Sequence, residues 1–98
     1  MNINQPVRVF DDANLIRDSV TMLCRDRFAG TADGQSPDFK SAVDQLCWDV
    51  FALQSRSYSF GMLVDKCSTI ITRTKSPALT QIRAKDLANE ICSPVGGW

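Results

Sequence analysis

Apolar residues recur at spacings of three and four along most of the chain, a pattern that predicts amphipathic helices. The first stretch runs from Asp12 to Phe28. Asp11 or Asp12 can accept hydrogen bonds from the free amides of the first turn, and Gly30 can adopt the left-handed conformation that ends many helices. We therefore expect a helix from about Asp12 to Phe28. Its stripe comprises Ile16, Val20, Leu23, Cys24 and Phe28, widened by Leu15 and Met22.

The second stripe begins at Ser36-Pro37 and is the clearest in the sequence. Serine is a favoured helix cap and proline a favoured first helical residue, so we expect a helix from Pro37 to Leu53. Its stripe comprises Phe39, Val43, Leu46, Cys47, Val50 and Leu53, with Ala42, Trp48 and Phe51 beside it. The third stripe comprises Phe60, Leu63, Val64, Cys67, Ile70 and Ile71.

No glycine or proline separates the second and third stripes, so two interpretations remain open. One helix from Pro37 to Arg73 would be a rod of about 55 Å, too long for a compact monomer and shared across a dimer. Alternatively the helix breaks near Ser55–Ser59, because serine side chains divert backbone hydrogen bonds into turns. We favour the break.

A fourth helix is expected from Pro77 to about Cys92, capped by Ser76 and stopped by Ser93-Pro94. Ala84 and Ala88 allow close approach, so this helix should pack between two neighbours. Its inward-facing residues are Leu79, Ile82, Leu87 and Ile91.

The ends of the chain are expected to lie outside the helices. Residues 1–10 form an arm in which Val7 to Phe10 alternate and favour an extended segment, although a lone strand is only marginally stable. Residues 94–98 are expected to be a mobile tail. The 98 residues thus predict a single all-α domain, a bundle of about four antiparallel helices.

Composition and charge narrow the class of protein. Apolar residues make up 44% of the chain and charged residues 22%, as in ordinary globular domains. No apolar run is long enough for a membrane span, and the first residues lack the pattern of a secretory signal. A cytoplasmic location is expected. The net charge is zero, but residues 1–53 carry five cations against eight aspartates, whereas residues 54–98 carry six cations against three acidic residues.

The four cysteines, Cys24, Cys47, Cys67 and Cys92, fall one in each expected helix, on or beside its apolar stripe. That placement favours reduced thiols in the core. Disulfides and a convergent tetracysteine metal site remain alternatives that the sequence leaves open. No histidine and no Cys-x-x-Cys pair is present, so we expect no metal and no cofactor.

Motifs that would indicate catalysis are missing. The chain has no histidine for general base catalysis, no phosphate-binding glycine loop with its lysine, and no Gly-x-Ser-x-Gly elbow. Cys24 lies late in its helix, where the dipole disfavours a thiolate. We therefore expect no catalytic residues and no enzymatic activity.

Large apolar side chains are abundant for so short a chain, and they indicate a binding surface. Exposed aromatics and methionines are enriched at interfaces, but a helix at the centre of the bundle would bury the same side chains. The candidate interface residues are Trp48, Phe51, Tyr58, Phe60 and Met62. The expected function is a non-enzymatic protein–protein interaction module that forms a homodimer or joins a larger assembly. An adaptor fits this description, as does an accessory protein of a virus, acting in the host cytoplasm.

Nucleic-acid binding is the alternative function, because the C-terminal half carries a basic excess. Exposed cations and threonines around the start of the fourth helix can contact phosphates, and Tyr58 can add a stacking surface. The neutral net charge weakens this interpretation. The candidate contacts are Arg56, Arg73, Lys75, Arg83 and Lys85.

Overall fold

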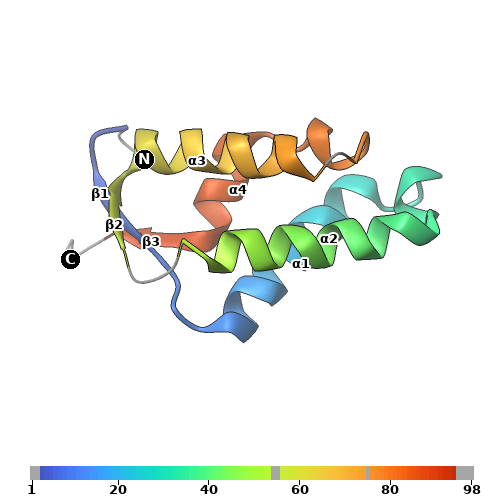
Figure 1. The fold of residues 1–98 in the computed structure, drawn as a ribbon, viewed down its shortest axis with the longest axis horizontal. Helices are drawn as coiled ribbons and strands as arrows, with labels where there is room; N and C mark the ends of the chain where they lie inside the picture. Colours follow the sequence, from blue (N-terminus) through green and yellow to red (C-terminus); the bar gives the residue numbers. More distant parts are fainter. Residues whose placement is uncertain (1–2, 54–55, 75, 95–98) are drawn as a thin grey trace.

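The computed structural model describes residues 3–53, 56–74 and 76–94. The chain forms four helices and three short strands, with one strand before α1, one between α2 and α3, and one after α4 (Figure 1). The elements are β1 (Pro6–Val9), α1 (Ala13–Phe28), α2 (Pro37–Phe51), β2 (Ser57–Ser59), α3 (Phe60–Arg73), α4 (Ala84–Ile91) and β3 (Cys92–Pro94). Short 3₁₀ turns lie at Asp33–Gln35 and Leu79–Gln81. The expected mobile tail lies outside the described residues, except that Pro94 belongs to β3.

The ends of α1 confirm the sequence prediction. The Asp12 carboxylate accepts hydrogen bonds from the backbone N–H groups of Asn14 at 2.8 Å and Leu15 at 3.3 Å. Gly30 has a φ of 72°, in the left-handed region that glycine adopts without steric cost. Local backbone chemistry therefore sets both ends of this helix.

The break between α2 and α3 is confirmed, and the alternative of one continuous rod is wrong. The chain leaves α2 after Phe51, two residues before the predicted end, and forms β2 before α3 begins. Ser59 caps α3, because its hydroxyl oxygen accepts from the Met62 N–H at 3.2 Å. At the start of α2 the prediction was only partly right. Pro37 occupies the first turn, but Ser36 makes no side-chain capping bond.

The fourth helix is much shorter than predicted. Ser76 accepts a hydrogen bond from the Leu79 N–H at 3.3 Å but begins only the 3₁₀ turn, and α4 starts at Ala84. At about 100° per residue, the stripe of the first half would point some 180° away from that of the second half in one helix. A break with extended backbone at Ile82 and Arg83 lets both stripes reach the core. The two buried sets are Ala78, Leu79 and Ile82, and Leu87, Ala88 and Ile91.

The all-α prediction is right for the four helices but omits a small sheet, which β1 and β3 near the chain ends form together with β2 from the middle of the chain. The strand order is β2-β1-β3 and both pairings are antiparallel. Val7 lies opposite Tyr58, and Val9 lies opposite Cys92. All four of these side chains are buried, whereas Arg8, between them on β1, is exposed. The extended segment that the sequence indicated is thus the central strand of the sheet.

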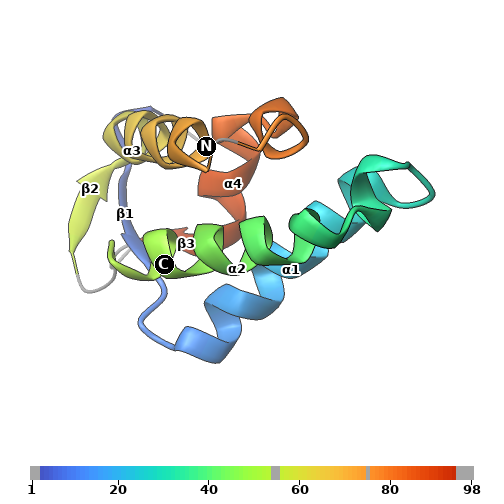
Figure 2. The ribbon, with the colours of Figure 1, turned by 45° about the vertical axis from the view of Figure 1, so that its right-hand side comes forward.

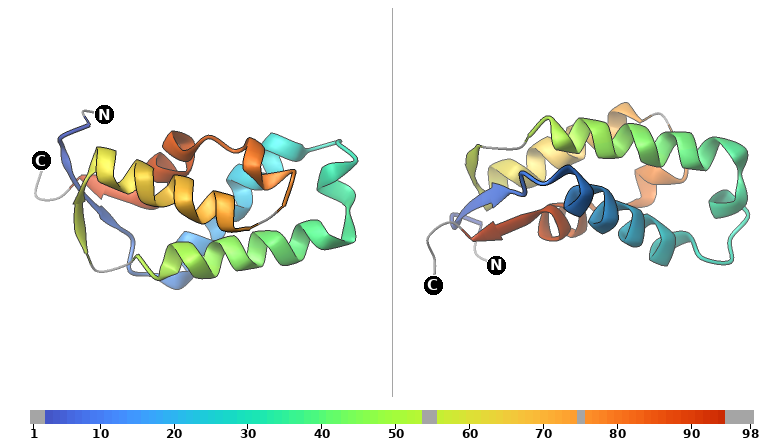
Figure 3. Two further views of the ribbon diagram at one scale, coloured as in Figure 1. Left: turned by 45° about the horizontal axis from the view of Figure 1, so that its top comes forward. Right: turned by 90° about the horizontal axis from the view of Figure 1, so that it is seen from below.

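The helices alternate in direction between two ends of the molecule. The sheet lies at one end, and the two 3₁₀ turns lie toward the other (Figures 1 and 3). α4 packs against both α1 and α3, as its alanines predicted. Seen from a second direction, the turn between α1 and α2 projects beyond α3 and α4 (Figure 2). Within the part of the chain that is described, no helix has the length and apolar character needed to cross a membrane.

Candidate interaction surface

Trp48 is the most exposed aromatic side chain among the described residues, with 65% of its surface accessible. It lies on α2 beside the first turn of α1, where a shallow pocket of about 110 Å³ opens between the two helices. Phe51, half-buried, lines the same pocket. Of the two alternatives that the sequence left open, burial of Trp48 at the centre of the bundle is therefore wrong. A role for Trp48 at an interface stays a prediction. The other lining residues are Ala13, Arg17 and Cys47.

A larger groove of about 480 Å³ continues along the seam between α1 and α2. Arg17 lines both hollows, so they follow one face of this helix pair. The side chains of Phe28 and Phe39 pack edge to face near the far end, with ring centroids 5.4 Å apart. The groove thus has an aromatic end and a volume sufficient for a large side chain. Its apolar lining includes Cys24, Phe28, Phe39 and Val43.

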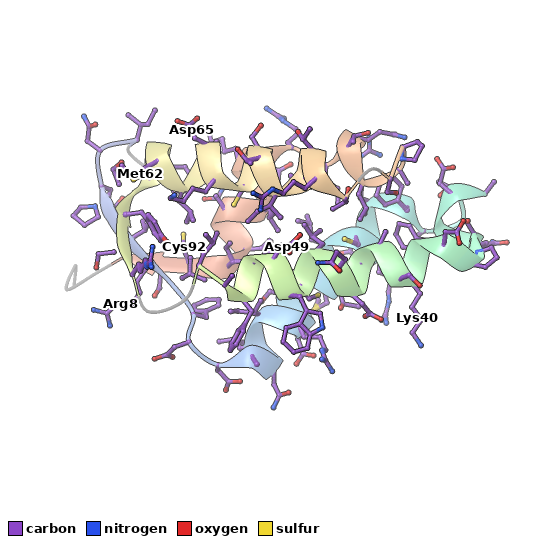
Figure 4. The ribbon with its side chains drawn as sticks, in the orientation of Figure 1. Arg8, Lys40, Asp49, Met62, Asp65 and Cys92 are labelled. Carbon is purple, nitrogen blue, oxygen red and sulfur yellow. The ribbon has the colours of Figure 1, made fainter. Side chains whose placement is uncertain are left out.

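The rim of this groove is basic. Arg17, Arg25 and Lys40 line it together with one carboxylate, that of Asp44. Lys40 points away from α3, toward the outer side of the helix pair (Figure 4). This basic rim lies within residues 1–53, whose net charge is negative. A net charge summed over that half of the sequence therefore conceals the rim.

Two of the predicted interface residues belong to the core instead. Tyr58, on β2, and Phe60, the first residue of α3, are only 7% and 2% exposed. The Tyr58 hydroxyl donates to the Leu53 carbonyl at 3.4 Å, and the Lys66 ammonium lies 5.6 Å from the ring centroid. Tyr58 therefore cannot offer a ring for stacking on a base.

Met62 is exposed but lies apart from Trp48. It occupies the first turn of α3, at the sheet end of the molecule (Figure 4). Gly61 beside it donates its backbone N–H to the Ile3 carbonyl at 2.8 Å. Ile3 and Met62 are both exposed large apolar side chains, with 63% and 53% of their surfaces accessible.

Two residues that were expected to widen the core stripe of α1 face solvent. Leu15 is 45% exposed and Met22 is 59% exposed. At 3.6 residues per turn both lie roughly opposite the buried stripe, so helical geometry alone could have identified them. They add apolar surface to the outer side of α1.

The candidate nucleic-acid contacts are only partly brought together. Arg56 precedes β2 and Arg73 ends α3, so the whole length of α3, about 20 Å, separates them. Arg83 and Lys85 stand at the start of α4, and both are exposed. Lys75 lies outside the described residues.

All four cysteines are buried and unpaired, which agrees with the preferred prediction of core thiols rather than with disulfides. Burial raises the pKa of Cys24 and of Cys67 to about 12. It also raises the pKa of Cys92 to about 11, and that of Cys47. Such thiols stay protonated near neutral pH and are poor nucleophiles. Among the residues that the structure describes, no three His, Cys, Asp or Glu side chains are placed to hold a metal ion.

A third hollow, of about 520 Å³, lies on the other side of α2, facing the segment after α3. Its lining combines two carboxylates, those of Asp33 and Asp38, and the hydroxyl groups of Thr74 and Ser76 with the apolar side chains of Phe39, Ala42, Pro77 and Ala78. Its described lining includes no exposed aromatic side chain like Trp48. The α1–α2 face is therefore the better candidate, because there an exposed tryptophan lies close to a hollow with a basic rim.

Comparisons with protein-family models, with curated proteins and with solved structures find no match to this chain. Inferences about function therefore rest on the physical character of its surfaces.

Proposed function

We propose that the chain is a non-enzymatic protein-binding module that self-associates through the outer face of α1 and α2. The observation that carries this proposal is Trp48, a tryptophan with 65% of its surface in water at the small pocket between α1 and α2. Exposing so much apolar area costs free energy in a monomer, and burial against a partner removes that cost. Tryptophan is also among the residues that contribute most to binding at interfaces.

The buried thiols support a binding role over catalysis. The raised pKa values of Cys24 and Cys47 keep both thiols protonated. Asp44 is the one carboxylate among the described residues that line the α1–α2 groove, so the groove has no carboxylate pair for acid–base catalysis. A binding surface needs complementary shape and charge, which the apolar floor and basic rim of this groove provide.

Oligomeric state as a function of concentration tests the proposal. Light scattering and sedimentation are expected to show a reversible monomer–dimer equilibrium. Trp48→Ala should weaken it about thirty-fold, as expected for an interface residue that contributes roughly 2 kcal/mol. Met62→Ala is the matched control, because it also removes an exposed large apolar side chain but lies on α3. A strict monomer at high concentration contradicts the proposed self-association.

Nucleic-acid binding is the second candidate, supported by the exposed cations Arg73, Arg83 and Lys85. It has less support than self-association for two reasons. Tyr58 is buried, so the expected stacking surface is lost, and Arg56 stands at the opposite end of α3.

A further inference from the structure

One row of side chains from each helix frames the groove between α1 and α2. Residues four positions apart are neighbours along a helix surface. The row on α1 consists of three residues that all line the groove, Arg17, Thr21 and Arg25. The row on α2 consists of Lys40 and Asp44, which line the groove, and Trp48, which lines the small pocket beside it. The two rows are therefore the opposite rims of one seam.

The two helices run in opposite directions, so the rims can be matched turn by turn (Figures 1 and 3). Arg17 and Trp48 line the same small pocket and therefore lie at one level of the seam. Two turns further along, the last members of the rows, Arg25 and Lys40, lie on opposite sides of the groove. The helices stay close at that level, where the edge-to-face contact of the Phe28 and Phe39 rings joins them.

Arg25 and Lys40 form a pair of like charges across the groove. Both side chains are exposed, and within the described part of the chain neither makes an ion pair. Asp44, the one carboxylate among the described lining residues, lies a full turn from Lys40 along α2. Two facing cations repel each other, and an anion between them replaces that repulsion with two attractions.

Beneath these cations the groove is apolar. Its floor consists of Cys24 and Phe28 from α1 and Phe39 and Val43 from α2. The connection between the two helices lines its far end. The volume of about 480 Å³ lies within the range of roughly 300–1,000 Å³ that is typical of small-molecule sites. An apolar floor below a pair of cations matches a molecule with an apolar body and one anionic head.

We propose that this groove binds a free amphipathic anion, a carboxylate on an apolar chain or ring of about the size of a medium-chain fatty acid. The carboxylate lies between Arg25 and Lys40, and the apolar body covers Phe28, Phe39 and Val43. The Arg25 guanidinium can donate two parallel hydrogen bonds to a carboxylate, and the Lys40 ammonium can donate another. The size of the groove, and its closure at one end by the helix connection, favour a small molecule over a peptide segment. This site is separate from the proposed self-association, because its lining does not include Trp48.

Calorimetric titration with dodecanoate, below the concentration at which it forms micelles, tests the proposal. One molecule should bind per chain with a dissociation constant in the micromolar range. Dodecanol has the same chain without the charge and should bind about ten-fold more weakly. Decanoate is two methylenes shorter and should also bind about ten-fold more weakly, because it buries less apolar surface.

Substitutions at the rim test the position of the carboxylate. Arg25→Gln and Lys40→Gln should each weaken dodecanoate binding about three-fold, and together about ten-fold. Asp44→Asn should strengthen it about two-fold, because it removes the competing carboxylate. Arg83→Gln and Lys85→Gln are the matched controls, since they remove the same charges at the start of α4, and they should leave binding unchanged. All five substituted side chains are exposed, so the fold should survive.

Methyl NMR spectra give an independent readout of the site. Dodecanoate should shift the methyl resonances of Val43, which lines the groove. The methyl resonances of Val9, buried on β1 at the sheet end of the molecule, should stay in place.

The outcomes separate this site from self-association. If neither the wild type nor the Trp48→Ala variant, in which a second copy covers the groove less, binds dodecanoate, the proposal is overturned. Equal weakening by the Arg83→Gln and Lys85→Gln controls also overturns it, because the attraction would then be nonspecific. An acidic peptide or an anionic phospholipid vesicle that binds at Arg25 and Lys40 where dodecanoate does not assigns the groove to another class of partner and overturns it too. A chain that binds dodecanoate but stays monomeric supports this site and contradicts only the proposed self-association.

Discussion

Cys67 places an ionisable thiol inside the core, and this makes stability sensitive to alkaline pH. The side chain is fully buried on α3. Burial, with the nearby Cys92 thiol as a smaller contribution, raises its pKa from 9.0 to about 12. In the unfolded chain the thiol ionises near its ordinary pKa of 9.0. Because the pKa is raised in the folded chain, the contribution of the protonated Cys67 thiol to the free energy of unfolding is complete below pH 9.0. This contribution is lost as the pH rises toward 12.

The expected magnitude follows from these two pKa values. At about pH 10.5, the unfolded thiol has released its proton and the folded one has kept it, which lowers the free energy of unfolding by about 2 kcal/mol. Cys67→Ala removes this contribution. The variant should be less stable at neutral pH, because it leaves a cavity, but its stability should fall less steeply with pH. The free energy of unfolding of the variant should therefore lie about 2 kcal/mol closer to that of the wild type at about pH 10.5 than at about pH 8.

Urea unfolding followed by circular dichroism measures this convergence, at one protein concentration and with a reducing agent present. Val20→Ala is the control, because it also opens a cavity at a fully buried position but removes no thiol. Its alkaline fall should match that of the wild type. If Cys67→Ala and the wild type lose stability in parallel, the thiol does not ionise as its burial implies.

Four further predictions concern local contacts and surfaces. Asp12→Ala should lower the free energy of unfolding by about 1 kcal/mol in urea titrations, whereas Asp12→Asn retains the cap. Gly30→Ala should cost about 1 kcal/mol by the same measurement, since its φ is 72° and no neighbouring atom lies within 4 Å of an added Cβ; an unchanged midpoint would contradict this. An aromatic disulfide reagent should label the thiols slowly until the chain is denatured, and rapid labelling of all four in the native state contradicts their burial. If the basic surface binds nucleic acid, titrations at two salt concentrations should show a steep salt dependence, which Arg73→Ala/Arg83→Ala/Lys85→Ala should abolish.

Local sequence chemistry determined the first three helices. Apolar stripes of period 3.6 identify the buried face of each, and the ends follow from groups a few residues away. The Asp12 carboxylate reaches amides two and three residues ahead, and Ser59 reaches the Met62 amide. Such interactions need no other part of the fold. The core positions of Cys24, Cys47 and Cys67 follow from the same stripes, whereas Cys92, expected in the fourth helix, is buried on β3.

The helix predicted from Pro77 to Cys92 was too long, although the apolar pattern of that segment contained the information needed to divide it. The apolar residues after Ser76 fit two short stripes that point in opposite directions, not one helix. A comparison of their angles would have predicted the break before Ala84. The sheet is different, because β2 and β3 are three residues each and carry no recognisable strand pattern. They become strands because β1, distant in sequence from both, lies between them and supplies their hydrogen-bond partners.

The interaction surface was decided by the tertiary structure. Trp48, Tyr58 and Phe60 are all large aromatic residues, yet one is exposed and two are buried. What separates them is whether another element covers that side of the helix or strand. Tyr58 contacts Leu53, just after α2, and Lys66 on α3, whereas nothing in the described chain covers Trp48. The sequence by itself determined which segments are helical and which stripe each must bury, because those depend on neighbours three or four residues away. Only the packing of α1, α2 and the sheet decided which remaining apolar side chains face water, because that depends on contacts between residues far apart along the chain.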